Sequence, residues 1–100
     1  MEPECKRITR VVLPAIRASI ADAMGKKGYT QVEIAERLGI VQVAVSKYLN
    51  NKCSKDVINL KSYIESRKLN SEILSVIFNG AKKQEIDSKI GLLCEQISTL

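Results

Sequence analysis

Apolar residues near the start of the chain recur every three or four positions, which is the spacing of one face of an α-helix. This spacing predicts a first helix over residues 5–12. Pro14 then interrupts the pattern, because proline has no amide donor and disfavours a helical conformation at Leu13. We expect either a kink at this point or a new helix that begins at Pro14 and runs to about Met24.

The next two helices are marked by their start and stop signals. Thr30, followed three residues later by Glu33, forms a capping box, and Gly39 is a natural helix stop. The sequence therefore predicts one helix over residues 31–38 and another over residues 42–49. The valines that alternate across the start of this second helix are too few to indicate a strand.

Three more helices follow. Ser54 can cap a helix that runs to about residue 67, and Ser71 can cap another that ends near residue 79. A last amphipathic helix is expected over about residues 84–98. We therefore predict an all-α fold of five to six helices. Because the chain has only 4% aromatic residues and no Trp, its core must be aliphatic.

The charges divide the chain into two parts. Its formal net charge is +5, but residues 1–68 carry thirteen Lys and Arg against seven Asp and Glu, whereas residues 69–100 carry three against four. A basic first part and a nearly neutral second part suggest a polyanion-binding domain over residues 1–68, followed by a helical tail over residues 69–100. Charge alone does not distinguish nucleic acid from an anionic membrane surface.

No segment suggests a membrane or secreted protein. The chain has neither a secretory signal nor a run of about 20 apolar residues that could span a bilayer, so we expect a cytoplasmic protein. The three cysteines, Cys5, Cys53 and Cys94, are far apart and there is no His, so no metal site is expected. We interpret them as buried or half-buried thiols. A redox-sensitive disulfide between subunits is the alternative, with Cys94 as its best candidate.

The segment over residues 31–50 has the residue types that two crossing helices need. Such helices approach closely through a tight turn, and the small side chain of Ala35 permits that approach. Gly39 can adopt the left-handed conformation of the turn. Val45 and Leu49 then fill the space between the helices, which leaves a polar face without acidic groups on the second helix. A purely structural helical hairpin is the alternative.

The segment TQVEIAERLGIVQVAVSKYLN (Thr30–Asn50) resembles the helix-turn-helix of phage repressor and Cro-type regulators. Together with the preceding LPAIRASIADAM, it is similar to small archaeal predicted transcriptional regulators, whose DNA-binding unit is also fused to thiamine-phosphate synthase-like domains. The resemblance covers about residues 5–68 and is loose in the tail. Val41 and Val43 depart from it, since a Ser or Thr cap and a small polar residue are usual at these positions.

The resemblance implies a set of DNA contacts. Side chains of the second helix would read base edges in the major groove; they are Gln42, Val43, Ser46 and Lys47. Gln can bond to adenine, Lys to guanine, and Val can pack on a thymine methyl group. Gln31 would touch a phosphate. By their position alone, five more residues are expected to contact phosphates; they are Lys26, Lys27, Asn50, Lys52 and Lys55.

Apolar residues of the last helix form one narrow stripe, with alternating steps of four and three residues. The stripe consists of Ile86, Ile90, Leu93, Ile97 and Leu100. Two heptads are too few for an independent coiled coil, so the stripe must pack on another surface, either its own domain or a second subunit. We favour a second subunit, because helix-turn-helix proteins usually bind DNA as dimers. Residues 69–100 would then be the dimerisation element.

These patterns predict a homodimeric transcription regulator that binds double-stranded DNA at a palindromic operator. The alternative is an antitoxin or adaptor whose helical tail mainly binds a protein partner. With no His, no carboxylate pair at a plausible cleft and no phosphate-binding glycine loop, the chain lacks the usual groups of an enzyme. No cofactor, metal or membrane partner is expected, and the sequence identifies no small-molecule effector. Missing exposed aromatic residues disfavour RNA binding.

Overall fold

The chain is helical throughout the part that the structure describes. The computed structural model describes residues 8–99. Its elements in chain order are η1 (Ile8–Val12), α2 (Leu13–Lys26), α3 (Gln31–Leu38), α4 (Gln42–Leu49), α5 (Lys55–Arg67), α6 (Ser71–Phe78) and α7 (Lys83–Ser98). Residues 8–99 contain no β-strand, so the predicted all-α class is confirmed. Both helices of the candidate helix-turn-helix have their predicted bounds.

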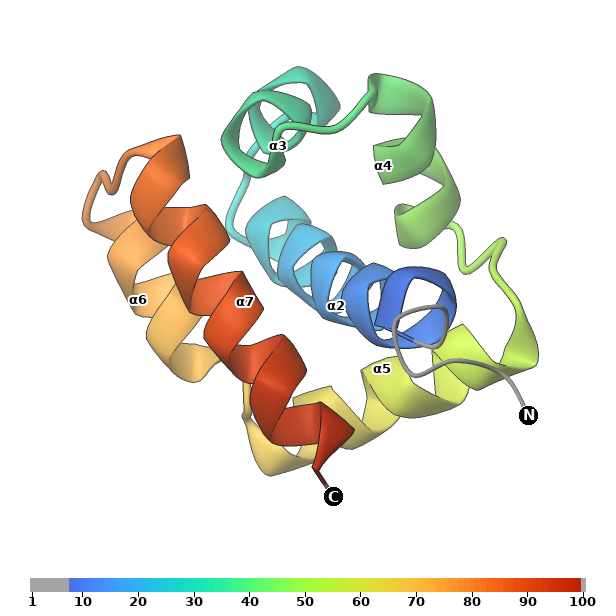
Figure 1. Ribbon diagram of the computed structural model, residues 1–100. Helices are drawn as coiled ribbons and strands as arrows, with labels where there is room; N and C mark the ends of the chain where they lie inside the picture. The colour runs from blue at the N-terminus through green and yellow to red at the C-terminus, as the bar shows by residue number, and fades with distance from the viewer. Residues whose placement is uncertain (1–7, 100) are drawn as a thin grey trace.

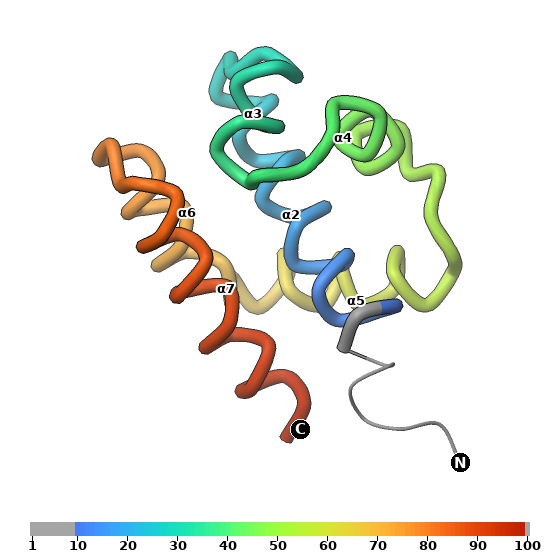
Figure 2. The backbone as a smooth tube through the Cα atoms, turned by 45° about the horizontal axis from the view of Figure 1, so that its top comes forward, coloured from blue at the N-terminus to red at the C-terminus, as the bar shows by residue number. Residues whose placement is uncertain are grey.

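Helix α2 lies at the centre of the fold and contacts every other element. Figure 1 shows α3 and α4 above it, α5 below it, and the hairpin of α6 and α7 along one side. In the turned view of Figure 2, α4 and the α6–α7 hairpin again lie on opposite sides of α2. The fold is thus a set of helices arranged around one buried helix.

The sequence of α2 explains its central place. The four consecutive residues 18–21 are all buried, and successive residues of a helix point about 100° apart, so they cannot share one face. A helix buried on several sides must be apolar around most of its circumference, and its alanines let the neighbouring helices approach closely. Its one buried polar side chain, Ser19, is satisfied by a bond to the Ile16 carbonyl at 2.8 Å.

The predicted interruption at Pro14 coincides with a helix start. The single π-helical turn η1 leads into α2, which begins at Leu13 and has Pro14 as its second residue. N–H groups in the first turn of a helix have no partner within that helix, so proline loses no hydrogen bond there. The expected new helix therefore forms, one residue earlier than predicted.

One predicted helix start is wrong. Ser71 does not cap α6 but is its first helical residue, and Asn70 holds the cap position without a side-chain cap hydrogen bond. The Asn70 amide instead donates to the Ser19 hydroxyl at 3.1 Å, and both side chains are buried. Buried polar groups are costly to leave unbonded, so this bond between distant residues prevails over local capping.

The apolar stripe of the last helix is buried in the chain's own core. Ile86 is fully buried, and the next three members, Ile90, Leu93 and Ile97, are 5%, 5% and 3% exposed. They share one apolar cluster with side chains of α2, α3 and α5. The expected dimer interface at these four residues is therefore wrong, because α2 offers an apolar face within the same chain. Leu100 lies outside the described residues.

The two predicted segments share this core. The boundary at residue 68 coincides with the turn between α5 and α6, but apolar side chains from both sides of it pack together. A fully buried Ile or Leu contributes roughly 1.5–3 kcal/mol, so the four stripe residues together contribute about 6–12 kcal/mol. Whole domains are stable by only about 5–15 kcal/mol. The tail is therefore part of the fold.

Five helices end in the same local structure. A residue with left-handed backbone follows each helix from α2 to α6, and the N–H of the next residue donates to the carbonyl five positions before it. The left-handed residues are Gly28, Gly39, Asn51, Lys68 and Gly80. Glycine and asparagine adopt this conformation readily, whereas at Lys68, with φ 55°, it costs about 1–2 kcal/mol.

Lys68→Gly is expected to stabilise the protein by about 1 kcal/mol, because glycine adopts a φ of 55° without the Cβ clash. Arg67→Gly is the matched control. Arg67 is the last helical residue of α5, so glycine there should destabilise the protein by about 0.5–1 kcal/mol. Urea unfolding of the three proteins measures both effects. A loss of stability in Lys68→Gly would contradict the strain assigned to this position.

Candidate nucleic-acid interface

Helix α3 is fixed at its start by the predicted capping box. The Thr30 hydroxyl accepts from the Glu33 N–H at 3.1 Å, and the Glu33 carboxylate accepts from the Thr30 N–H at 2.9 Å. The hydrogen bond from the Thr30 backbone lowers the pKa of the Glu33 carboxyl group most, and the interaction with the Thr30 side chain lowers it further. The stabilisation is therefore fully present above the ordinary pKa of the group and is lost as the pH falls through the lowered value.

The turn between α3 and α4 is built on Gly39. Its backbone is left-handed at φ 65°, and its N–H donates to the Glu36 carbonyl. The Ile40 N–H donates to the Ala35 carbonyl at 3.0 Å, which closes the turn. Ala35 and Val45 are both buried, as the close crossing of two helices requires.

The start of α7 packs over this turn. A Cβ on Gly39 would collide with the Cε atom of Lys83. Beside this contact, Arg37 Nη1 donates to the Ala81 carbonyl at 3.4 Å, and the two residues are 44 positions apart in the chain. The ammonium of Lys83 also pairs with Asp87 at 3.3 Å, and the end of this side chain covers the turn. No local sequence signal predicted this contact, because its partners are so distant in the chain.

Helix α4 has one buried side and one open side. Val45 is fully buried, and Tyr48 and Leu49 are half-buried against the core. The predicted base-reading side chains lie on the open side; Gln42, Val43 and Lys47 are exposed, and Ser46 is half-buried. These four residues share one face of the helix, since they stand one turn apart, and α4 contains no acidic residue.

Three valines near the starts of α3 and α4 are exposed. Val41 is 70% exposed, Val43 is 66% exposed, and Val32, in the first turn of α3, is 51% exposed. Val41 holds the cap position of α4 without a side-chain hydrogen bond, in line with its departure from the usual Ser or Thr. Exposed methyl groups at the start of such a helix are suited to contact with thymine methyl groups. Of the three, the sequence pattern predicted only Val43 as a contact.

The residues after α4 form a defined turn. The Asn50 amide donates to the Ser46 carbonyl at 2.8 Å, which ties it to the last turn of the helix. The buried Lys61 ammonium donates to the Asn51 side chain at 3.0 Å and so joins this turn to α5. The two lysines that come next are exposed; they are Lys52 and Lys55.

The two lysines at the end of α2 contact other parts of the same chain. Lys26 pairs with Asp22 at 3.2 Å, and the Lys27 ammonium lies 5.3 Å from the centre of the Phe78 ring in α6. Because α6 and α4 lie on opposite sides of α2 (Figure 2), this contact places Lys27 away from the open side of α4. Gln31 is the first residue of α3 and is half-buried.

Both cysteines in the described part of the chain are free thiols. Cys94 is buried, and burial raises the pKa of its thiol, so the reactive thiolate is disfavoured. Cys53 is half-buried, and Cys5 lies outside the described residues. Across residues 8–99, no group of three His, Cys, Asp or Glu side chains is placed to hold a metal ion. Within the same range, no helix has the length and apolar character needed to cross a membrane.

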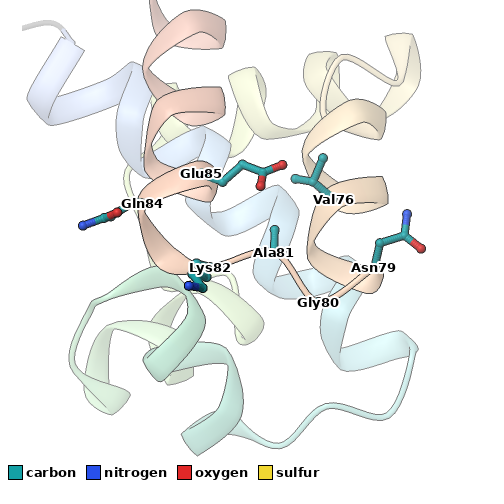
Figure 3. A pocket seen from close by; sticks show the side chains of 7 residues that line it. All are labelled: Val76, Asn79, Gly80, Ala81, Lys82, Gln84 and Glu85. Atoms are coloured by element: carbon teal, nitrogen blue, oxygen red, sulfur yellow. The ribbon is translucent and has the colours of Figure 1, made fainter.

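A surface hollow of about 510 Å³ lies at the turn between α6 and α7. Figure 3 shows Val76 and Glu85 turned toward each other across it, while Gln84 points away. Polar groups converge on one point in ligand sites, and they do not do so here. The hollow therefore offers no alternative to the open side of α4 as the functional site.

Comparison with known families agrees with this geometry. Residues 20–65 match the family model described as helix-turn-helix. The matched segment runs from α2 into α5, and so contains the capping box, the Gly39 turn and the open side of α4. No curated protein and no solved structure matches the chain. Residues 20–65 therefore have both the sequence features and the geometry of a helix-turn-helix. The match supports DNA binding and transcription regulation.

Gly39→Ala is expected to lower the free energy of unfolding by about 2 kcal/mol, because a left-handed φ strains alanine by about 1–2 kcal/mol and the new Cβ displaces Lys83. In the double variant with Lys83→Ala the collision is gone and only the backbone strain remains. The two changes together should therefore cost less than the sum of their separate effects in urea unfolding. Strictly additive costs would contradict the contact between Lys83 and the turn.

Proposed function

We propose that α4 enters the major groove of duplex DNA and reads base edges with the four side chains of its open side. Those side chains are Gln42, Val43, Ser46 and Lys47. The main support is the division of α4: Val45 is fully buried, while the opposite side is accessible and free of acidic groups. A helix held by one side and open on the other suits the major groove, which is about 12 Å wide.

Each side chain of the open side has a suitable partner on a base edge. Gln42 can donate to and accept from one adenine, and Lys47 can donate to guanine O6 or N7. Val43 can pack on a thymine methyl group, and the exposed Val41 beside it enlarges this apolar surface. Ser46 can donate or accept. We therefore expect a half-site that contains both A·T and G·C pairs.

The proposed phosphate contacts lie on both flanks of α4. Lys52 and Lys55 follow it and are exposed. Gln31 begins α3, where the first N–H groups of the helix also attract anions. Asn50 directly follows α4, and its amide donates to the Ser46 carbonyl at 2.8 Å and to the Ser46 hydroxyl at 3.5 Å, so it would turn from these partners to reach a phosphate. Lysines that contact α2 or α6 instead are the weakest of the predicted contacts; they are Lys26 and Lys27.

A homodimer on a palindromic operator is the second part of the proposal. Helix α4 has 8 residues, and at about 1.5 Å per residue it reaches only a few base pairs. Two copies on adjacent half-sites would supply the specificity that one short helix lacks. The surface that joins the copies must differ from the α7 stripe, because the core of each chain already contains that stripe.

The antitoxin or adaptor alternative loses its main support through the same observation. It depended on an apolar stripe of the tail that would be free to bind a protein partner. That stripe lies in the chain's own core, so no feature of the described residues favours this function over DNA binding.

Selection of bound sites from a random duplex library tests the proposal. We expect enrichment of two inverted half-sites whose centres lie about one helical turn of DNA apart, or a multiple of it. Sedimentation of the complex should give two protein chains for each selected site. A single asymmetric half-site with one bound chain would exclude the homodimer, and a library without enrichment would exclude sequence-specific readout.

Substitutions on α4 test the assigned roles. Gln42→Ala and Lys47→Ala are each expected to weaken binding to the selected operator by about 1–3 kcal/mol, and to affect random DNA far less. Lys52→Ala should weaken binding to both DNAs. It should also reduce the slope of log affinity against log salt concentration by about 1. Lys27→Ala is the control with little effect, because its ammonium lies on Phe78. Fluorescence anisotropy measures the affinities, and equal losses on both DNAs from all variants would contradict these roles.

A further inference from the structure

A second cavity lies beside the turn between α3 and α4. It is open to solvent, has a volume of about 360 Å³ and is lined by α2, this turn and α7. Its apolar walls are formed by Leu13, Leu38 and Ile90. Two charged residues, Lys83 and Asp87, also line it, but they pair with each other at 3.3 Å and are half exposed. A volume of this order is enough for a small organic molecule.

Arg17 supplies the unbalanced charge of this cavity. It lines the cavity from α2 and carries a positively charged guanidinium. Its Nε atom is buried, and it has no hydrogen-bond partner among the described residues. A buried N–H of a charged group is costly to leave unbonded. Because the charges of Lys83 and Asp87 cancel, the residues that line the cavity carry one net positive charge, that of Arg17.

Gly91 keeps the cavity open from the side of α7. Glycine in the interior of a helix is destabilising relative to alanine, so its presence needs a reason. Close packing does not explain the glycine, since a Cβ at this position would meet no atom within 4 Å. A left-handed backbone does not explain it either, because Gly91 is not among the residues with positive φ. The missing side chain leaves room in the cavity, which Gly91 lines.

We propose that this cavity binds a small organic carboxylate. The carboxylate would accept hydrogen bonds from Arg17, and the apolar body of the molecule would lie against Leu13, Leu38 and Ile90. One unbalanced positive charge within apolar walls matches a monoanion with an apolar body better than a phosphate, which carries more charge and no apolar surface.

The cavity is placed to influence α4. Leu38 and Gly39 belong to both the cavity and the helix-turn-helix turn, and Arg17 also interacts with the Tyr48 side chain of α4. A carboxylate that draws the Arg17 guanidinium toward itself changes its interaction with Tyr48, and so changes DNA affinity. This regulatory part of the proposal rests on DNA binding by α4, whereas binding of the carboxylate does not.

Thermal unfolding with sodium benzoate as the probe tests the binding at constant ionic strength and without DNA. Benzoate should raise the Tm of the wild type in a saturable way. Benzamide has nearly the same shape without the charge, and acetate has the charge without the apolar body, so both should raise the Tm far less. Equal effects of benzoate and acetate, or no effect of benzoate, would overturn the proposal.

Variants locate the binding to this cavity. Arg17→Met removes the charge, and Gly91→Leu fills the space; each should weaken benzoate binding at least about tenfold. The matched controls are Arg67→Met, which removes an exposed arginine of α5, and Ser88→Leu, which adds a leucine to an exposed position of α7. Both should bind benzoate as the wild type does. Because Gly91→Leu meets open space, it keeps the test decisive should Arg17→Met fail to fold.

Anisotropy with the selected operator tests the regulatory part. We expect saturating benzoate to change the operator affinity of the wild type at least about threefold and to leave that of Gly91→Leu unchanged. A wild type that binds benzoate but has the same operator affinity with and without it would overturn the regulatory part alone. A protein that binds benzoate but no DNA would overturn the proposed function and leave the carboxylate site standing.

Discussion

Burial of α2 is the constraint on which the rest of the structure depends. Its side chains point in several directions and most of them are apolar, so no single neighbour can remove them from water. The helices around it are short: α3, α4 and α6 have 8 residues each, and isolated helices below about 12–15 residues are marginal in water. They form because they pack on α2 or on its other neighbours. For the same reason the tail cannot be a separate dimerisation arm, since without α7 one side of α2 would lie open.

Packing alone does not decide where each short helix stops, and local backbone chemistry does. The left-handed residue after each of five helices reverses the chain within one turn and satisfies two of the orphan carbonyls at the helix end. At Gly39 this reversal also sets the angle between α3 and α4. The same small residue admits the side chain of Lys83, so one position serves the turn and its contact with α7. A larger residue would disturb both.

The parts of this fold that sequence could predict are those decided by near neighbours. The capping box at Thr30 and the stop at Gly39 fixed the bounds of α3, and the open side of α4 followed from which residues must face α3. Periodicity also identified the buried stripe of α7, but it says nothing of which surface covers a stripe, and the covering surface proved to be intramolecular. For a similar reason, the position of Lys27 along the chain does not reveal that its ammonium lies over Phe78.

Helix α4 depends on its neighbours more than any other part of the interface. It has no side-chain cap at Val41, and Val45 is its one buried residue. Its position is therefore set from outside, by the Gly39 turn before it, by the bond between Lys61 and Asn51 after it, and by the electrostatic interaction of Tyr48 with Arg17 of α2. Each of these belongs to another element of the fold. A helix that is positioned in this way responds to small changes in α2 and α7, because little in its own sequence resists them.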